Sequence, residues 1–253
     1  MYLEETINSV LSQNIPDLEY IVMDGGSTDG SVEIIKRYSK YLTYWQSQKD
    51  GGQTDAICSG FERATGEVLC WINSDDRYEP GALQLVAREF EQDPELQLLY
   101  GDYSLSYSDG REVPKPKISF DLNICIYAFL MIPQPSSFWR ASIYRKVGGL
   151  NREFQYSFDY DFFLRVGYAL KDQPRSIKHI QTSLSKFRVH DESKSVSQIP
   201  QFQIERSRIY QQFNLSKHAA VRRFWNYYQM LRTVWRFWIE RRIFVYKKEK
   251  GKA

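Results

Sequence analysis

Helix-spaced and strand-like segments alternate along the first 107 residues, and this alternation constrains the fold more than any other feature. Apolar residues at Leu3, Ile7 and Val10 repeat at the spacing of a helix face, whereas Tyr20–Met23 is a continuous apolar run typical of a buried strand. The pattern predicts further helices at 31–41, 53–66 and 80–93, and strands at 18–24, 42–48, 67–76 and 96–107. Strands that alternate with helices predict an α/β fold, with helices on the faces of a mostly parallel sheet.

Two of these expected strands end in carboxylates. Asp24 ends the first strand, and Asp75 and Asp76 end the strand at 67–76. Because ligands of open α/β sheets bind outside the carboxyl ends of the strands, we expect these side chains to meet on one rim. Carboxylate oxygens suit Mg²⁺ or Mn²⁺, which in turn bind diphosphates. The simpler alternative for both segments is a solvated strand-to-helix turn with a capping residue.

Three further segments carry candidate site residues. The stretch "KDGGQTDA" places Asp50 and Asp55 on either side of a flexible turn. Asp159 opens an expected helix at 158–170, where it could take a proton from an acceptor hydroxyl, and His190 could contact a phosphate or a metal. Each also has a structural interpretation, as a helix-terminus charge or a packed histidine. The glycine turns match neither the dinucleotide-binding pattern nor a P-loop.

The net charge of +3 hides an asymmetry between the two ends of the chain. Residues 217–253 hold eleven Lys and Arg and two Glu, a net +9, which leaves −6 for residues 1–216. Aromatic residues repeat at helical spacing within 222–250, so we expect a helix that either rests on an anionic membrane surface or packs on the preceding domain. Nucleic-acid binding is disfavoured because there is no second basic patch. Three widely spaced cysteines, without metal or disulfide spacing, favour a cytoplasmic protein. The segment 222–250 could hold this protein at the cytoplasmic face of the membrane.

Taken in order, these motifs resemble family 2 of the inverting glycosyltransferases, which use nucleotide-sugar donors and have the GT-A fold, a three-layer α/β/α sandwich. The resemblance covers about residues 1–195. It rests on "LEETINSVLSQ", "LEYIVMDGGSTDGS", "QKDGGQTDAICSGFERATGEVLCWINSDDRYEPGAL", "PQPSSFWR", "KVGGLNREFQYSFDYDFFLR" and "FRVHDESKS".

The resemblance implies a role for each candidate residue. The donor would be bound by four aspartates, the metal by an aspartate with a histidine near the diphosphate, and the acceptor would be deprotonated by one aspartate. In chain order, the implied roles are nucleotide-base contact for Asp24, nucleotide-sugar pocket for Asp50 and Asp55, sugar or ribose contact for Asp75, Mn²⁺ or Mg²⁺ ligand for Asp76, catalytic base for Asp159, and metal or diphosphate contact for His190.

The chain departs from the family pattern at three places. Asn73 stands where the metal motif usually begins with Asp, and Phe158 stands where many members have Glu. Members also usually carry a central strand before the first helix, and here the sequence starts inside that helix. We therefore expect that Met1 is internal to a longer chain. The expected domains are an N-terminally incomplete catalytic domain at 1–196 and a helical, basic, aromatic-rich extension at 197–253.

Two functions follow from these expectations. The first is a metal-dependent inverting glycosyltransferase that moves a sugar from a nucleotide-diphosphate donor to a glycan or lipid-linked acceptor, in polysaccharide or glycolipid assembly. Inversion requires one in-line displacement, with a base on the acceptor side and charge stabilisation on the leaving diphosphate. The alternative is a catalytically impaired nucleotide-sugar-binding or membrane-associated module.

Overall fold

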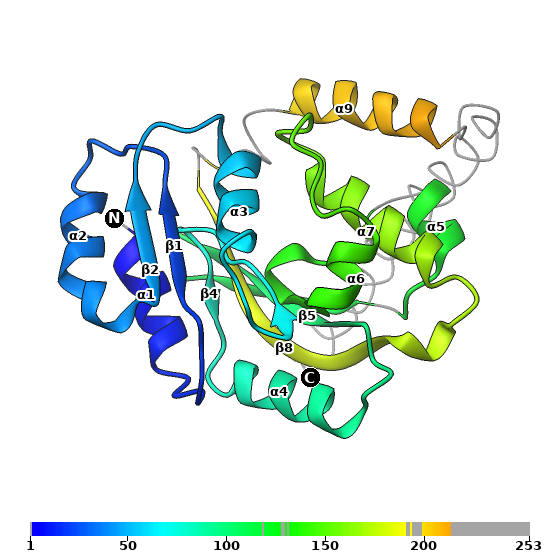
Figure 1. Ribbon diagram of the computed structural model, residues 1–253, viewed down its shortest axis with the longest axis horizontal. Helices are drawn as coiled ribbons and strands as arrows, with labels where there is room; N and C mark the ends of the chain where they lie inside the picture. Colours follow the sequence, from blue (N-terminus) through cyan, green and yellow to red (C-terminus); the bar gives the residue numbers. More distant parts are fainter. Residues whose placement is uncertain are drawn as a thin grey trace, which may run out of the picture.

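The structure is a computed structural model that describes residues 2–117, 119–127, 130, 132–190, 193 and 199–213. The expected helices and strands of the N-terminal half are present (Figure 1). The elements are α1 (Leu3–Leu11), β1 (Ile21–Asp24), α2 (Ser31–Tyr38), β2 (Tyr44–Ser47), α3 (Gln53–Phe61), β3 (Val68–Leu69), β4 (Arg77–Tyr78), α4 (Ala82–Gln92), β5 (Leu98–Tyr107), β6 (Glu112–Lys115), α5 (Leu122–Tyr127), β7 (Ser137–Arg140), α6 (Ala141–Lys146), α7 (Phe158–Ala169), β8 (Ile177–Val189) and α9 (Ile199–Gln212), with short 3₁₀ turns at Ser39–Tyr41, Gln134–Ser136 and Pro174–Ser176.

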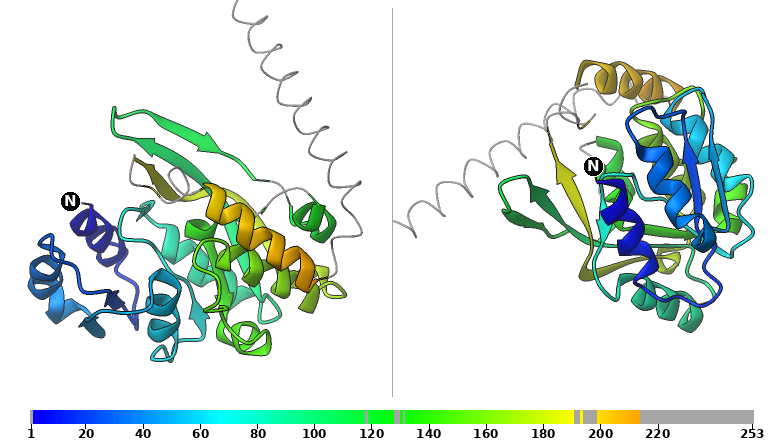
Figure 2. Two further views of the ribbon diagram at one scale, coloured as in Figure 1. Left: turned by 90° about the horizontal axis from the view of Figure 1, so that it is seen from above. Right: turned by 90° about the vertical axis from the view of Figure 1, so that its left-hand side faces the viewer.

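The strands form two sheets. The small one pairs β1 with β2 in parallel, and the large one has the order β3-β7-β5-β8-β4, with β6 paired to the outer part of β5. The expectation of a mostly parallel sheet is wrong in this detail, because the large sheet is mixed: β5–β8 is parallel, whereas β3–β7, β5–β7, β4–β8 and β5–β6 are antiparallel. A tight hairpin at 108–110 makes β6 run back along β5. Figure 2 shows this hairpin reaching out from the body of the molecule.

Helices cover both faces of the large sheet, so the three-layer α/β/α arrangement is present (Figure 1). Side chains of β5 alternate between the two faces: Leu98 and Tyr100 belong to one core cluster and Leu99 to the other. In β7, Phe138 and Trp139 divide in the same way. Because of this alternation, β5 and β7 pack on one face against α3, α6 and α7 and on the other face against α1 and α4.

The described part of the C-terminal region also packs on the domain. In α9, Ile209 is fully buried in the core cluster that contains α7. The expected basic aromatic helix at 222–250 lies outside the described residues. Within the described part of the chain, no helix has both the length and the apolar character that crossing a bilayer requires.

Candidate active site

Four of the aspartates singled out from the sequence line one cavity. Asp24, Asp50, Asp75 and Asp159 come from the end of β1, the loop before α3, the loop after β3 and the first turn of α7. The cavity has a volume of about 1270 Å³ and continues between β1 and β3, where apolar side chains of both strands form its walls. The carboxylates that follow separate strands in the sequence therefore share one space in the fold.

Asp24 organises the glycine turn that follows β1. Its Oδ2 accepts hydrogen bonds from the backbone N–H groups of Gly26 (3.1 Å) and Ser27 (3.0 Å) and from the Ser47 hydroxyl (2.6 Å). Burial raises the pKa of this carboxyl, but the bonds from Ser27 and Ser47 outweigh it and hold the pKa below its ordinary value. The flexible turn is thus fixed in one conformation by a carboxylate that stays ionised.

The loop at 49–52, which carries Asp50, lies directly against the glycine turn at 24–27. A Cβ atom on Gly25 would be 3.1 Å from both carboxylate oxygens of Asp50, so a side chain there would require the Asp50 carboxylate to move. Asp50 accepts a hydrogen bond from the Gly52 N–H at 2.8 Å and faces the cavity. Asp55 instead accepts the Gly51 N–H and forms an ion pair with Arg152, so its carboxylate is occupied by the protein itself.

The third acidic segment is built around Asn73. Its amide N–H₂ donates to Asp76 (3.2 Å) and Gln134 (3.1 Å), while its amide oxygen accepts from Gln53 (2.9 Å). An amide can donate and accept at once, whereas an ionised aspartate could only accept and would repel Asp76. The departure from the usual Asp therefore has a structural reason. The sequence pattern did not single out Gln53 or Gln134, although both lie within the quoted motifs.

Asp76 lies behind the cavity wall. It is 1% exposed, and its carboxylate also accepts the backbone N–H of Arg188 at 3.0 Å. Burial, together with the neighbouring charge of Asp75, raises the pKa of Asp76 to about 7. Asp75 points the other way, toward the cavity, and its Oδ2 lies 2.9 Å from Nε2 of His190.

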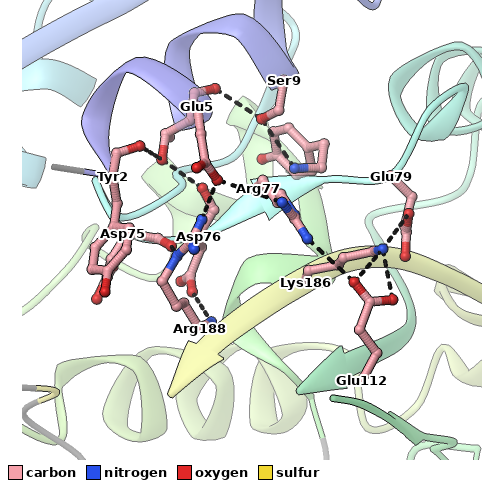
Figure 3. Close-up of polar contacts among 12 residues, drawn as sticks. Tyr2, Glu5, Ser9, Asp75, Asp76, Arg77, Glu79, Glu112, Lys186 and Arg188 are labelled. Carbon is pink, nitrogen blue, oxygen red and sulfur yellow. Dashed lines mark hydrogen bonds and ion pairs between the residues drawn. The ribbon is translucent and has the colours of Figure 1, made fainter. Parts of the chain in front are cut away.

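The segment 74–76 is held between α1 and β8 (Figure 3). The Arg188 guanidinium donates to the Asp75 carbonyl at 2.9 Å, pairs with Glu5 at 2.5 Å and lies 4.1 Å from the centre of the Tyr2 ring. From the other side, the Thr6 hydroxyl donates to the Asp76 carbonyl at 2.6 Å. Arg188 was missed from the sequence. Arg188 stands two residues before His190, and this spacing, which places two residues on the same face of a strand, is the signal that could have found it.

Asp159 stands at the N-terminal turn of α7, as predicted, and lines the cavity. Its Oδ1 accepts the Tyr160 N–H at 2.7 Å. Burial raises the pKa of Asp159 to about 6, against the opposing effects of the Tyr160 N–H and the positive charge of Arg206. The preceding Phe158 is 5% exposed and packs against Trp71, so the residue before the aspartate serves the core.

The family of the chain follows from comparison with known proteins. The profile of "Glycosyl transferase family 2" matches residues 1–148, and an uncharacterized glycosyltransferase of Mycobacterium tuberculosis is 30% identical over 178 residues, which cover 70% of this chain and 67% of that protein. The chain therefore belongs to glycosyltransferase family 2. A PGL/p-HBAD biosynthesis glycosyltransferase of Mycobacterium bovis is 28% identical over 170 residues, covering 64% of this chain and 63% of that protein.

Solved structures show the same fold at lower identity. TarS 1–349 of S. aureus in complex with UDP-GlcNAc matches with a TM-score of 0.61 and 20% identity, over 78% of this chain and 57% of that one. The mannosyltransferase PcManGT of Pyrobaculum calidifontis, in complex with GDP-Man and Mn²⁺, matches with a TM-score of 0.54 and 16% identity, over 76% and 54%. These likenesses confirm the GT-A fold expected from the sequence. The chain spans only a little over half the length of either solved structure.

Proposed function

We propose that this chain transfers a sugar from a nucleotide-diphosphate donor to a hydroxyl group of a glycan or lipid-linked acceptor, with inversion at the anomeric carbon. The observation that carries the proposal is that Asp159 shares one cavity with Asp24, Asp50 and Asp75. Two structural neighbours hold UDP-GlcNAc and GDP-Man, and one relative is named for PGL/p-HBAD biosynthesis, which supports a sugar nucleotide as donor and glycolipid assembly as the setting.

Asp159 has the properties of a general base in this reaction. With its pKa raised to about 6, its carboxylate is ionised at neutral pH and is a stronger base than an ordinary aspartate. It takes the acceptor O–H proton while the acceptor oxygen forms a bond to the anomeric carbon. The bond from that carbon to the diphosphate oxygen breaks, and the nucleoside diphosphate leaves. The glycine loops of Asp24 and Asp50 also line the cavity, and we place the nucleotide against them.

The donor set fits a divalent cation that is shared with the diphosphate. Within the described residues, no three His, Cys, Asp or Glu side chains converge on one metal position. Asp75 lines the cavity, and its Oδ2 lies 2.9 Å from Nε2 of His190, which is not itself a lining residue. The carboxylate oxygen of Asp75 suits Mn²⁺ or Mg²⁺, and the neighbouring imidazole and diphosphate oxygens would complete the shell. Asp76 is buried behind the cavity wall, so it would influence the cation indirectly, through its hydrogen bond with Asn73 and its charge next to Asp75. A bound cation would offset the negative charge that develops on the leaving diphosphate.

Transfer assays with a panel of UDP-, GDP- and TDP-sugars test this proposal. Asp159→Asn is expected to lower the transfer rate by about 10²–10⁴-fold, because it removes the base, and to change donor affinity by less than about twofold. Asp172→Asn, an exposed aspartate just beyond α7, is the matched control and should transfer at the normal rate. Near-normal transfer by Asp159→Asn would refute the assignment. Donor binding without transfer by the unaltered chain would favour the binding-module alternative.

A further inference from the structure

Glu205 of α9 binds the segment that leads into α7. Glu205 is 8% exposed, and its carboxylate accepts three successive backbone N–H groups: Gln155 at 2.7 Å, Tyr156 at 2.8 Å and Ser157 at 2.7 Å. Ser157 is the N-cap residue of α7, and its own side chain makes no capping bond. A buried carboxylate from another helix thus satisfies backbone donors that would otherwise lie unpaired beside the start of α7.

The same segment is held from both sides. On the α3 side, the Thr54 hydroxyl donates to the Phe154 carbonyl at 2.6 Å. On the α9 side, the Ser157 hydroxyl donates to the Phe202 carbonyl at 3.3 Å, and the rings of Tyr156 and Phe202 meet edge to face with centroids 5.5 Å apart. Tyr156 and Phe202 also line the cavity, so this contact is part of its wall. Figure 1 shows α9 lying along this end of the molecule, next to α7.

The geometry points to Glu205 as a positioning residue: its carboxylate fixes residues 155–157 and thereby the position of the Asp159 carboxylate in the cavity. This inference rests on the proposed role of Asp159 as the base. Since Asp159 lies two residues beyond Ser157, release of the three N–H groups would let the first turn of α7 shift. We also infer that the catalytic unit extends past residue 196, through α9.

The charge of Glu205 gives the proposal a second readout. Besides burial, which raises the pKa of Asp159, the backbone N–H groups of Tyr160 and Asp159 and the Arg206 guanidinium lower it, and the Glu205 carboxylate raises it. Replacement of Glu205 by a neutral residue removes a raising effect, so the pKa of Asp159 falls. A base with a lower pKa becomes ionised at lower pH, and the acid limb of the rate profile moves to lower pH.

The test compares Glu205→Gln and Glu205→Asp with Arg208→Gln, a change of charge on the exposed face of the same helix. Glu205→Gln is expected to lower kcat by about 10²-fold, leave the donor KM within about twofold and shift the acid limb downward. Amide hydrogen exchange at 155–157 should become faster. Glu205→Asp keeps the charge and should recover part of kcat, whereas Arg208→Gln should match the unaltered chain in kcat and exchange.

Two results would overturn the proposal. One is an unchanged kcat with unchanged exchange at 155–157 in a folded Glu205→Gln variant. The other is loss of folding in both Glu205 variants, which would make the carboxylate a general requirement of the fold. Asp159→Asn measured in parallel separates the two proposals: if it is inactive while Glu205→Gln is normal, only the positioning role fails, and if it is active, the role of Asp159 as base fails first.

Discussion

The guanidinium group of Arg188 joins β8, α1 and the 74–76 loop, and its removal gives a prediction whose size can be worked out. Arg188→Met keeps the alkyl stem and the backbone N–H that binds Asp76. It loses a charged hydrogen bond to the Asp75 carbonyl, which contributes about 1.5–3 kcal/mol. It also loses the contact with the Tyr2 ring, about 0.5–1 kcal/mol, and an ion pair with the exposed Glu5, about 0–1 kcal/mol.

Together these losses predict that Arg188→Met lowers the free energy of unfolding by about 2–5 kcal/mol. Urea unfolding followed by tryptophan fluorescence measures it. Arg77→Met is the matched control, because Arg77 pairs with Glu5 and Glu112 at the surface, and Glu112 keeps its bond to Lys186. The control should lose only about 0.5–1 kcal/mol. If Arg188→Met costs no more than Arg77→Met, the contacts that join β8 and α1 to the 74–76 loop do not stabilise the fold as argued.

Four further predictions follow from the site and the sequence. Because a base must be ionised, the transfer rate should rise as pH increases through about 6 and level off above it. If the acid limb of the pH–rate profile stays at the same pH in an Asp159→Glu variant, another group sets it. Chelation with EDTA should stop transfer and Mn²⁺ restore it, with a higher Mn²⁺ requirement for His190→Gln, and transfer insensitive to EDTA would exclude the cation. A chain ending at residue 213 should float less with anionic liposomes than the full chain, and equal flotation would remove the membrane role of 222–250. If a strand precedes Met1, a version extended upstream in the reading frame should melt several degrees higher, since that strand would fill the part of the cavity that lies between β1 and β3; an unchanged Tm would contradict this.

Part of the site could be predicted because it depends on local order along the chain. Asp24 ends β1, Asp75 lies in the loop between β3 and β4, and Asp159 opens α7, so residue type and periodicity indicated them as candidates, and the resemblance to the family implied their roles. The mixed sheet could not be predicted in this way. Strand direction depends on which strands meet, and the short β7 joins β5 and β3 only through contacts between distant segments.

The same distinction separates the residues that were found from those that were missed. The sequence by itself determined the alternation of elements and the carboxylates that follow them, because hydrophobic period and residue type act over a few neighbouring positions. Only the tertiary structure decided that Asp55 faces Arg152, that Asp76 is buried behind Asp75, and that Arg188 and Glu205 reach segments 113 and about 50 residues away. Those contacts depend on how whole elements pack, and spacing along the chain carries no record of that packing.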